Sequence, residues 1–214
     1  MKKIAVVEKF FEPQHQRQIE AVAAKHGYTV DYYMDGVLPE ERAGEYEIVY
    51  GMPARTDLKG MTQLKWFCAS FAGVDRYVDE ALYPHEGVLL TNSAGAYGVT
   101  IAEHIIMVTL MLLRQMLPTM KAVGEKVWLP PLPVRSICGA SITVLGTGDI
   151  GTSFARRAKA MGAKSICGVR RTIKAADPAF DRIVTLSDLD SVLPDTDILV
   201  MALPSTGETA GVLS

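Results

Sequence analysis

The feature that most constrains the fold of this chain is a glycine-rich turn between two regular segments. The turn covers residues 144–151 and reads Val-Leu-Gly-Thr-Gly-Asp-Ile-Gly. The apolar run 141–145 predicts a strand before it, and the spacing of apolar residues in 149–161 predicts a helix after it. A second strand, predicted over 165–169, follows about twenty residues after the turn begins. This strand, turn, helix and strand predict the first unit of a doubly wound sheet that binds dinucleotides.

Each glycine of the turn has its own reason to lack a side chain. Gly146 permits the tight turn, and Gly148 lets the backbone approach a pyrophosphate. Gly151 lets the helix pack closely against the strand. The free N–H groups and the dipole at the start of the helix then attract phosphates. We interpret the turn as a dinucleotide site, with a tight turn that binds nothing as the alternative.

The end of the strand predicted over 165–169 indicates which dinucleotide the site accepts. Sites for NAD usually carry an Asp or Glu there, which binds the 2′-hydroxyl of the ribose. This chain has Arg170, Arg171 and Thr172 instead, and arginine offers a charged, bidentate group that suits a 2′-phosphate. The next acidic residues come too late to replace the missing acid. We predict NADP rather than NAD, with two solvated surface arginines as the alternative.

Composition excludes several classes of protein. The 214 residues are 49% hydrophobic and 21% charged, as in soluble globular proteins. The formal net charge of −2 leaves no basic excess for a nucleic acid, and the most apolar stretch, 105–113, is too short to span a membrane. Three widely spaced cysteines in apolar surroundings predict buried, reduced thiols of a cytoplasmic protein, with neither a disulfide nor a metal site.

The other segments alternate between strand-like and helix-like patterns, which favours parallel strands joined by crossovers. The further predicted strands cover residues 3–7, 28–33, 46–50, 64–69, 88–91 and 197–203, and the further helices cover 13–25 and 186–193. A long apolar helix is predicted over 100–117, before a proline-rich connector over 128–134. We therefore predict two α/β domains, one over residues 1–98 and one over 99–214.

Four segments, in order, resemble the D-isomer-specific 2-hydroxyacid dehydrogenase family. They are Ala69-Ser-Phe-Ala-Gly-Val-Asp75, the segment 92–104, the glycine turn 144–151 and Leu203-Pro-Ser-Thr-Gly-Glu-Thr209. The resemblance implies a flavodoxin-like substrate domain joined to a Rossmann nucleotide-binding domain, with the active site between them. It also implies reduction of small 2-keto acids, such as glyoxylate or hydroxypyruvate, by NAD(P)H.

The resemblance also implies roles for the matched positions. The backbone N–H groups of Ala72, Gly73 and Val74 would hold the substrate carboxylate, since a glycine-containing turn can aim several donors at one anion. An ordinary turn after a strand is the alternative. The residues implied for the cofactor are Thr100 near the nicotinamide, Gly146, Thr147, Gly148, Asp149, Ile150 and Gly151 at the pyrophosphate, Arg170, Arg171 and Thr172 at the ribose, and Leu203, Pro204 and Thr209 on the adenosine side.

The catalytic residues of the family find no match in this chain. Hydride transfer to a ketone needs a cation to polarise the carbonyl and an acid to protonate the new alkoxide. In the family an arginine, an acidic residue and a histidine supply them, all after the segment that 203–209 resembles. We therefore expect these residues beyond Ser214, and expect both domains to be incomplete at their C-terminal ends. His104 is expected to be a core or interface residue, and the 214 residues alone are predicted to lack reductase activity.

Two other function classes stay open, together with one prediction about assembly. Family relatives that act as corepressors make a non-catalytic dinucleotide-binding protein the main alternative, although no extended partner-binding motif is seen. Gly151 and the arginine pair argue against a methyltransferase that binds S-adenosylmethionine. The apolar residues of 100–117 exceed what two small domains need, and related enzymes pair through this region. We therefore predict a homodimer through this helix, acting on a small-molecule substrate.

Overall fold

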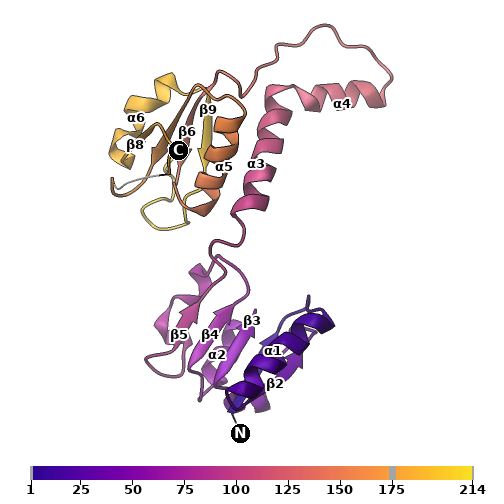
Figure 1. The fold of residues 1–214 in the computed structure, drawn as a ribbon, viewed down its shortest axis with the longest axis vertical. Coiled ribbons are helices and arrows are strands. Elements are labelled where there is room, and N and C mark those ends of the chain that lie inside the picture. Colours follow the sequence, from indigo (N-terminus) through magenta and orange to yellow (C-terminus); the bar gives the residue numbers. More distant parts are fainter. Residues whose placement is uncertain (1, 174–176, 214) are drawn as a thin grey trace. The chain divides into compact units, whose positions relative to one another are not determined.

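A computed structural model describes residues 2–173 and 177–213 (Figure 1). The chain divides into two compact units, Met1–Ala94 and Gly95–Ser214. The predicted domain boundary, between residues 98 and 99, falls four residues later than this division. That position lies inside the first turn of helix α3 (Gly98–Leu113), so the division at residue 94 keeps the helix whole.

The first unit is a parallel sheet in the flavodoxin-like order. Its strands are β1 (Lys2–Val7), β2 (Tyr28–Tyr33), β3 (Ile48–Gly51), β4 (Trp66–Ala69) and β5 (Leu89–Thr91), in the order β2-β1-β3-β4-β5. All neighbouring pairs are parallel. The helices are α1 (Pro13–Lys25) and α2 (Arg55–Gly60), with 3-10 turns at Glu40–Glu45, Asp75–Tyr77 and Glu80–Leu82. The strand order 2-1-3-4-5 confirms the predicted fold of this part.

Two strands of the first unit begin later than their apolar residues suggest. The predicted strands 46–50 and 64–69 are observed as β3 and β4, which start at residues 48 and 66. Tyr46 and Leu64 are fully buried, but they reach the core before the ladder begins. The hydroxyl of Tyr46 donates to Oδ2 of Asp31 at 2.9 Å. The apolar pattern therefore indicates which residues are buried here, and each hydrogen-bonded strand is shorter than its run of buried residues.

The second unit contains the first four strands of a Rossmann sheet. They are β6 (Ser141–Leu145), β7 (Ser165–Val169), β8 (Arg182–Val184) and β9 (Ile198–Met201), all parallel and in the order β8-β7-β6-β9. This is the 3-2-1-4 part of the doubly wound order. Helix α5 (Asp149–Ala160) follows β6, and the short helix α6 (Leu189–Val192) lies between the 3-10 turns Leu186–Asp188 and Leu193–Asp195. The predicted Rossmann class is confirmed, whereas β8, only three residues long, was not predicted.

The helix predicted over 100–117 is confirmed as far as Leu113, but it does not continue to 117 as one helix. Helix α3 ends at Leu113, and a second helix, α4 (Met116–Gly124), follows at an angle of 72°. Gln115 between them has φ 53° and ψ 42°, in the left-handed region. Pro118 explains the break, because it has no N–H for a continuing helix and its ring clashes with the preceding turn. Among the described residues, no single helix is long and apolar enough to cross a membrane, although the bent pair together has that length and composition.

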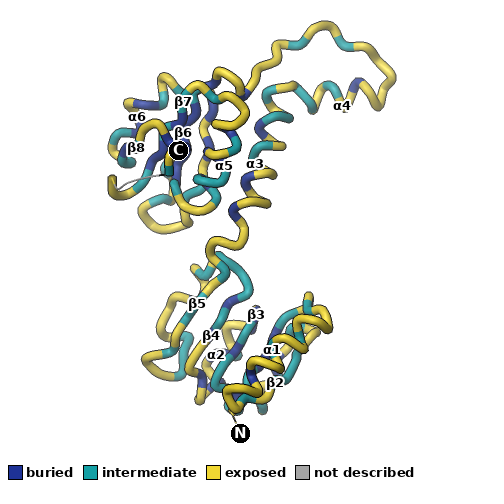
Figure 2. Tube along the Cα trace, in the orientation of Figure 1, coloured by how far each residue is buried: buried dark blue, intermediate teal, exposed yellow. Residues whose placement is uncertain are grey.

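Helix α3 packs on the core of the second unit, and α4 leaves it (Figures 1 and 2). Ala102 is buried, and Ile105, Ile106 and Leu110 pack against the cluster that includes Phe154 of α5. The opposite side of α3 and most of α4 are exposed. His104 is also exposed, so it is not a core residue, and its expected place in an interface stays a prediction.

The cysteines form no disulfide but are less buried than predicted. Cys138 is exposed, and Cys68 and Cys167 are half-buried. Burial raises the pKa of the Cys167 thiol. Cys138 lies between the proline-rich connector, which is irregular as predicted, and strand β6, so apolar neighbours in the sequence do not cover it.

Candidate functional site

A cavity of about 690 Å³ opens at the carboxyl ends of strands β6, β7 and β9. Leu145 pairs with Val169 on one side and with Met201 on the other, so the three strands end at the same level. The strand order reverses between β6 and β9, and ligands of doubly wound sheets bind at this switch point. The volume is also in the usual range for small-molecule sites. The sheet topology therefore places a ligand-sized cavity where the fold favours one.

The glycine turn shapes the floor of this cavity. Gly146 has φ +97°, and a Cβ atom there would lie 2.5 Å from the carbonyl oxygen of Ala202 after β9. A Cβ at Gly151 would overlap the carbonyl oxygen of Gly146, which confirms the predicted packing role of this glycine. At Gly148, by contrast, no heavy atom lies within 4 Å of the position that a Cβ would take. The turn is thus crowded on its protein side and open at Gly148.

Helix α5 begins directly after this open position. Gly148 is the residue before the helix, and Thr152 donates from its N–H to the Gly148 carbonyl at 2.9 Å. The hydroxyl of Thr152 also donates to the carbonyl of Thr147 at 3.1 Å, which fixes the turn. The N–H groups of the first helical turn have no partner within the helix, and the helix dipole is positive there. An open backbone beside such a helix start fits the pyrophosphate of a dinucleotide.

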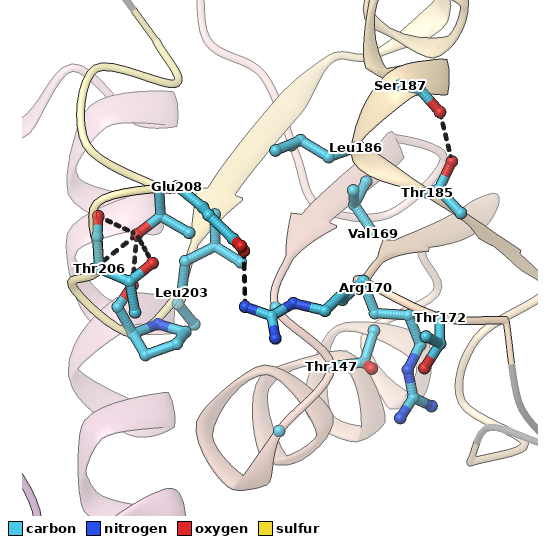
Figure 3. A pocket seen from close by; sticks show the side chains of 16 residues that line it. Thr147, Val169, Arg170, Thr172, Thr185, Leu186, Ser187, Leu203, Thr206 and Glu208 are labelled. Atoms are coloured by element: carbon cyan, nitrogen blue, oxygen red, sulfur yellow. Dashed lines mark hydrogen bonds and ion pairs between the residues drawn. The ribbon is translucent and has the colours of Figure 1, made fainter.

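Two arginines follow β7 at the side of the cavity (Figure 3). Nη2 of Arg171 lies 2.6 Å from Oε2 of Glu208, and both side chains are largely exposed. Arg170 also lines the cavity and forms no ion pair with any residue in the described part of the chain. No acid occupies the end of β7, where NAD-binding sites usually carry one. The cation at Arg170 therefore fits an anionic group at this wall.

The loop after β9 forms the opposite wall. The hydroxyl of Thr209 donates to the carbonyl of Pro204 at 2.6 Å and lies 3.1 Å from the Thr206 hydroxyl. The N–H of Thr206 donates to the Thr209 hydroxyl at 2.9 Å. These bonds close a compact turn over 204–209, visible as the cluster of dashed lines at Thr206 in Figure 3. Glu208 is held on this turn.

A third wall comes from residues that follow β8. Thr185, Leu186 and Ser187 line the cavity, and the Thr185 hydroxyl lies 2.7 Å from the Ser187 hydroxyl. Asp188 accepts from both the side chain and the N–H of Thr185, at 2.7 and 3.0 Å. These two hydrogen bonds hold the pKa of Asp188 below its ordinary value. The carboxylate therefore stays ionised and anchors this wall at neutral pH.

The structure brings together most of the residues that the sequence assigned to the cofactor. Nine of them line the cavity, namely Gly146, Thr147, Gly148, Arg170, Arg171, Thr172, Leu203, Pro204 and Thr209. Gly151 and Ile150 lie in α5 outside the lining. The carboxylate of Asp149 lies against Gly98 at the start of α3. Thr100 is exposed on α3, and its hydroxyl donates to the carbonyl of Tyr97 at 3.2 Å.

Some lining residues were not assigned from the sequence. They are Val169, Thr185, Leu186, Ser187, Ala202, Thr206 and Glu208. Residues 185–187 were missed because β8 was missed, although Ile183-Val184 followed by Thr185 resembles a short strand and a helix start. Glu208 belongs to the segment 203–209 that carried the family resemblance, but no role was given to it.

The loop assigned to the substrate carboxylate follows β4 in the first unit. The side chain of Asn92 donates to the carbonyl of Ala72 at 2.7 Å, and the N–H of Tyr77 donates to the carbonyl of Val74 at 2.7 Å. The carbonyls of the loop thus hold it in place. Within the part of the chain that the structure describes, the N–H groups of 72–74 donate to no protein acceptor. A Cβ at Gly73 would meet no atom within 4 Å, so an anion has room there.

A carboxylate lies next to this loop. Glu8 follows β1, and its Oε2 accepts from the hydroxyl of Ser70 at 2.5 Å. Neither residue was assigned a role from the sequence: Ser70 belongs to the segment 69–75 that carried the family resemblance, and no motif marks Glu8. Across residues 2–173 and 177–213, no group of three or more His, Cys, Asp and Glu side chains is arranged to hold a metal ion.

Comparison with known proteins identifies the family of this chain. Residues 106–214 match the family model described as D-isomer specific 2-hydroxyacid dehydrogenase, NAD binding domain. The glycerate dehydrogenase of Methylorubrum extorquens is 25% identical over 215 residues, covering 92% of this chain and 64% of that protein. A D-isomer specific 2-hydroxyacid dehydrogenase family protein from Aeromonas salmonicida superposes with a TM-score of 0.81 at 28% identity, over 97% of this chain and 66% of that one.

A more distant structure shares the fold. The NADPH-dependent glyoxylate/hydroxypyruvate reductase of Sinorhizobium meliloti, crystallised with NADP and sulfate, superposes with a TM-score of 0.72 at 22% identity. The superposition covers 98% of this chain and 64% of that one. The chain thus spans about two thirds of the length of the relatives that it matches.

Proposed function

Because the chain belongs to the D-isomer specific 2-hydroxyacid dehydrogenase family, we propose that it binds NADP(H) for hydride transfer to and from a small 2-keto or 2-hydroxy acid. The observation that carries the NADP preference is Arg170, a cation on the cavity wall without a partner ion, at the position where an acid would favour NAD. When bound, the nicotinamide supplies or accepts the hydride.

Each wall of the cavity has a function in this proposal. The open backbone at Gly148 and the start of α5 hold the pyrophosphate. Arg170 binds the 2′-phosphate, and Leu203 and Pro204 pack against the adenosine. In the first unit, the free N–H groups of 72–74 hold the substrate carboxylate.

A nucleotide titration tests the proposal. Tryptophan fluorescence or calorimetry would follow the binding of NADPH and NADH. A parallel titration with S-adenosylmethionine tests the alternative of a methyltransferase. Arg170→Ala should weaken NADPH binding by ten-fold or more, roughly the worth of one charge-assisted contact, and leave NADH nearly unchanged. Arg135→Ala is the matched control, because Arg135 is exposed in the same unit and does not line the cavity. Equal losses for NADPH and NADH would refute the 2′-phosphate assignment.

We further propose that the 214 residues bind the nucleotide without reducing keto acids. None of them matches the catalytic arginine, acid and histidine that the family implies. The measurement is NADPH oxidation at 340 nm with glyoxylate or hydroxypyruvate. Turnover above the rate without enzyme would contradict this proposal, and binding without turnover would agree with it. The non-catalytic, corepressor-like alternative would gain support only from a partner protein whose binding depends on the nucleotide.

Homodimerisation is proposed through the exposed sides of α3 and α4. Leu112, Leu117 and Val123 are largely exposed, and the Trp128 side chain after α4 is 96% exposed. Apolar side chains gathered on one pair of helices are typical of a covered interface. Light scattering should give about twice the 23.3 kDa mass at micromolar concentration. Leu117→Glu should shift the mass to that of a monomer, and a monomeric wild type would refute the proposal. Cytoplasmic localisation stays a prediction from the cysteine pattern.

A further inference from the structure

An ion pair crosses the mouth of the cavity between two of its walls. Arg171 follows β7. Glu208, which is labelled in Figure 3, lies on the turn after β9. Nη2 of the arginine and Oε2 of the glutamate are 2.6 Å apart, and both side chains line the cavity. We propose that Glu208 is a specificity-determining residue that lowers the affinity for 2′-phosphorylated nucleotides by occupying Arg171. This inference rests on the proposed function of the same cavity.

The turn that carries Glu208 is closed by its own hydrogen bonds. The Thr209 hydroxyl bonds to Pro204 and Thr206, and the N–H of Ala210 donates to the Thr206 carbonyl at 3.0 Å. Glu208 lies inside this closed turn, so its backbone has little freedom to move away from the cavity. The turn therefore keeps the backbone of Glu208 at the wall of the cavity, within reach of Arg171.

The pair is weak enough for a nucleotide to displace it. The side chains of Arg171 and Glu208 are 77% and 73% exposed. Exposed ion pairs change an equilibrium constant by no more than about five-fold. A phosphate carries nearly two negative charges and three acceptor oxygens, so it binds a guanidinium better than one carboxylate does. A nucleotide with a 2′-phosphate gains Arg171, but it must first break the pair and then tolerate the carboxylate nearby.

The two arginines therefore contribute unequally. Arg170 is half-exposed and forms no ion pair with another described residue, so it is available before the nucleotide arrives. Arg171 is paired with Glu208, so its contribution to nucleotide binding is offset by the loss of that pair. Removing the charge of Glu208 should release this second cation for the phosphate.

Binding of two adenosine fragments to the whole chain tests this inference. The probes are 2′,5′-ADP, which carries the 2′-phosphate, and 5′-AMP, which lacks it. Calorimetry should show that Glu208→Gln binds 2′,5′-ADP about three- to five-fold more tightly, with 5′-AMP unchanged. In an Arg171→Ala background, the same substitution should give a gain below about two-fold. Glu125→Gln is the matched control, because Glu125 is exposed in the same unit and does not line the cavity.

The outcomes separate this inference from the proposed function. If Arg170→Ala selectively weakens 2′,5′-ADP but Glu208→Gln leaves it unchanged or weaker, the role of Glu208 is refuted and the NADP assignment stands. A gain of equal size with and without Arg171 would also refute it, since the effect would then not pass through the pair. If the wild-type chain binds 2′,5′-ADP no more tightly than 5′-AMP and Arg170→Ala weakens both equally, both proposals fall together.

Discussion

Gly98 and Asp149 begin two neighbouring helices and lie in direct contact. Gly98 is the first residue of α3, and Asp149 is the first residue of α5. A Cβ atom at position 98 would overlap the carboxylate of Asp149. One carboxylate therefore lies at the N-terminal ends of two helices, where negative charge is stabilising.

This contact predicts a coupled pair of substitutions. Gly98→Ala should lower the free energy of unfolding by about 1–3 kcal/mol, because the added methyl must displace the carboxylate or the helix. Asp149→Ala in the same chain should relieve part of that loss, since the atom in the way is removed. Urea unfolding of the wild type, both single variants and the double variant measures the coupling. Additive losses would show that α3 itself, and not the carboxylate, is displaced.

The glycine turn predicts opposite outcomes for two neighbouring substitutions. Gly151→Ala should lower the melting temperature by several degrees, because its methyl overlaps the backbone at Gly146. Gly148→Ala meets open space, and its φ of −76° suits any residue, so the fold should keep its melting temperature. The same methyl would lie where the proposed pyrophosphate binds, so affinity for NADPH should fall by ten-fold or more. Nucleotide binding by Gly148→Ala at wild-type strength would contradict the position of the pyrophosphate.

Stability of the first unit should depend on pH through Glu45. Hydrogen bonds from Arg42 and Lys3 lower the pKa of Glu45 to about 2, from an ordinary 4.5. Because the pKa is lower in the folded state, this stabilisation is complete above about pH 4.5 and is lost as the pH falls toward 2. Glu45→Gln should therefore be less stable than the wild type at pH 6, and the difference should shrink near pH 2.

The control for this titration is Glu41→Gln on the same 3-10 turn. Glu41 is exposed and forms no ion pair with any residue among those described. Its urea midpoint should follow that of the wild type at every pH. A deficit of Glu45→Gln that is the same at pH 6 and pH 2 would contradict the assignment to this carboxylate.

The cysteines should differ in their reaction with thiol reagents. Cys138 is exposed, whereas Cys167 is half-buried and burial raises its pKa, which leaves less thiolate. Ellman's reagent at pH 8 should show one fast thiol, and Cys138→Ser should remove that phase. The fast phase persisting in Cys138→Ser would show that a half-buried cysteine opens readily.

The sequence predicted the elements whose residues follow a periodic pattern or whose ends are marked by strict steric rules. The strands 28–33, 141–145 and 165–169 and the helix 13–25 have the predicted bounds, because β-branched runs, a first-turn proline and glycine stops mark their ends. Strand β8 was missed because three residues give no periodicity. The long helix was overextended because its apolar stripe continues from Leu112 to Met116 across the break at Gln115.

The residues of the site also divide into those that the sequence predicted and those that it did not. Residues 146–148 and Arg170 were predicted from spacing along one βα unit, since the strand order brings their ends together. The pairing of Arg171 with Glu208 joins positions 37 residues apart and was not predicted. It depends on how the turn 204–209 closes, which the hydroxyl of Thr209 determines and no periodicity records.

At the carboxyl ends of β6, β7 and β9, different atoms maintain the fold and select the ligand of the proposed site. Main-chain atoms and glycines form the floor of the cavity, so that part tolerates little change without loss of the fold. The side chains at the rim, which are half-exposed Arg170 and exposed Arg171 and Glu208, add little to stability. In the proposed site, a lineage could therefore exchange one dinucleotide for another through two or three surface substitutions, while the scaffold beneath them stays the same.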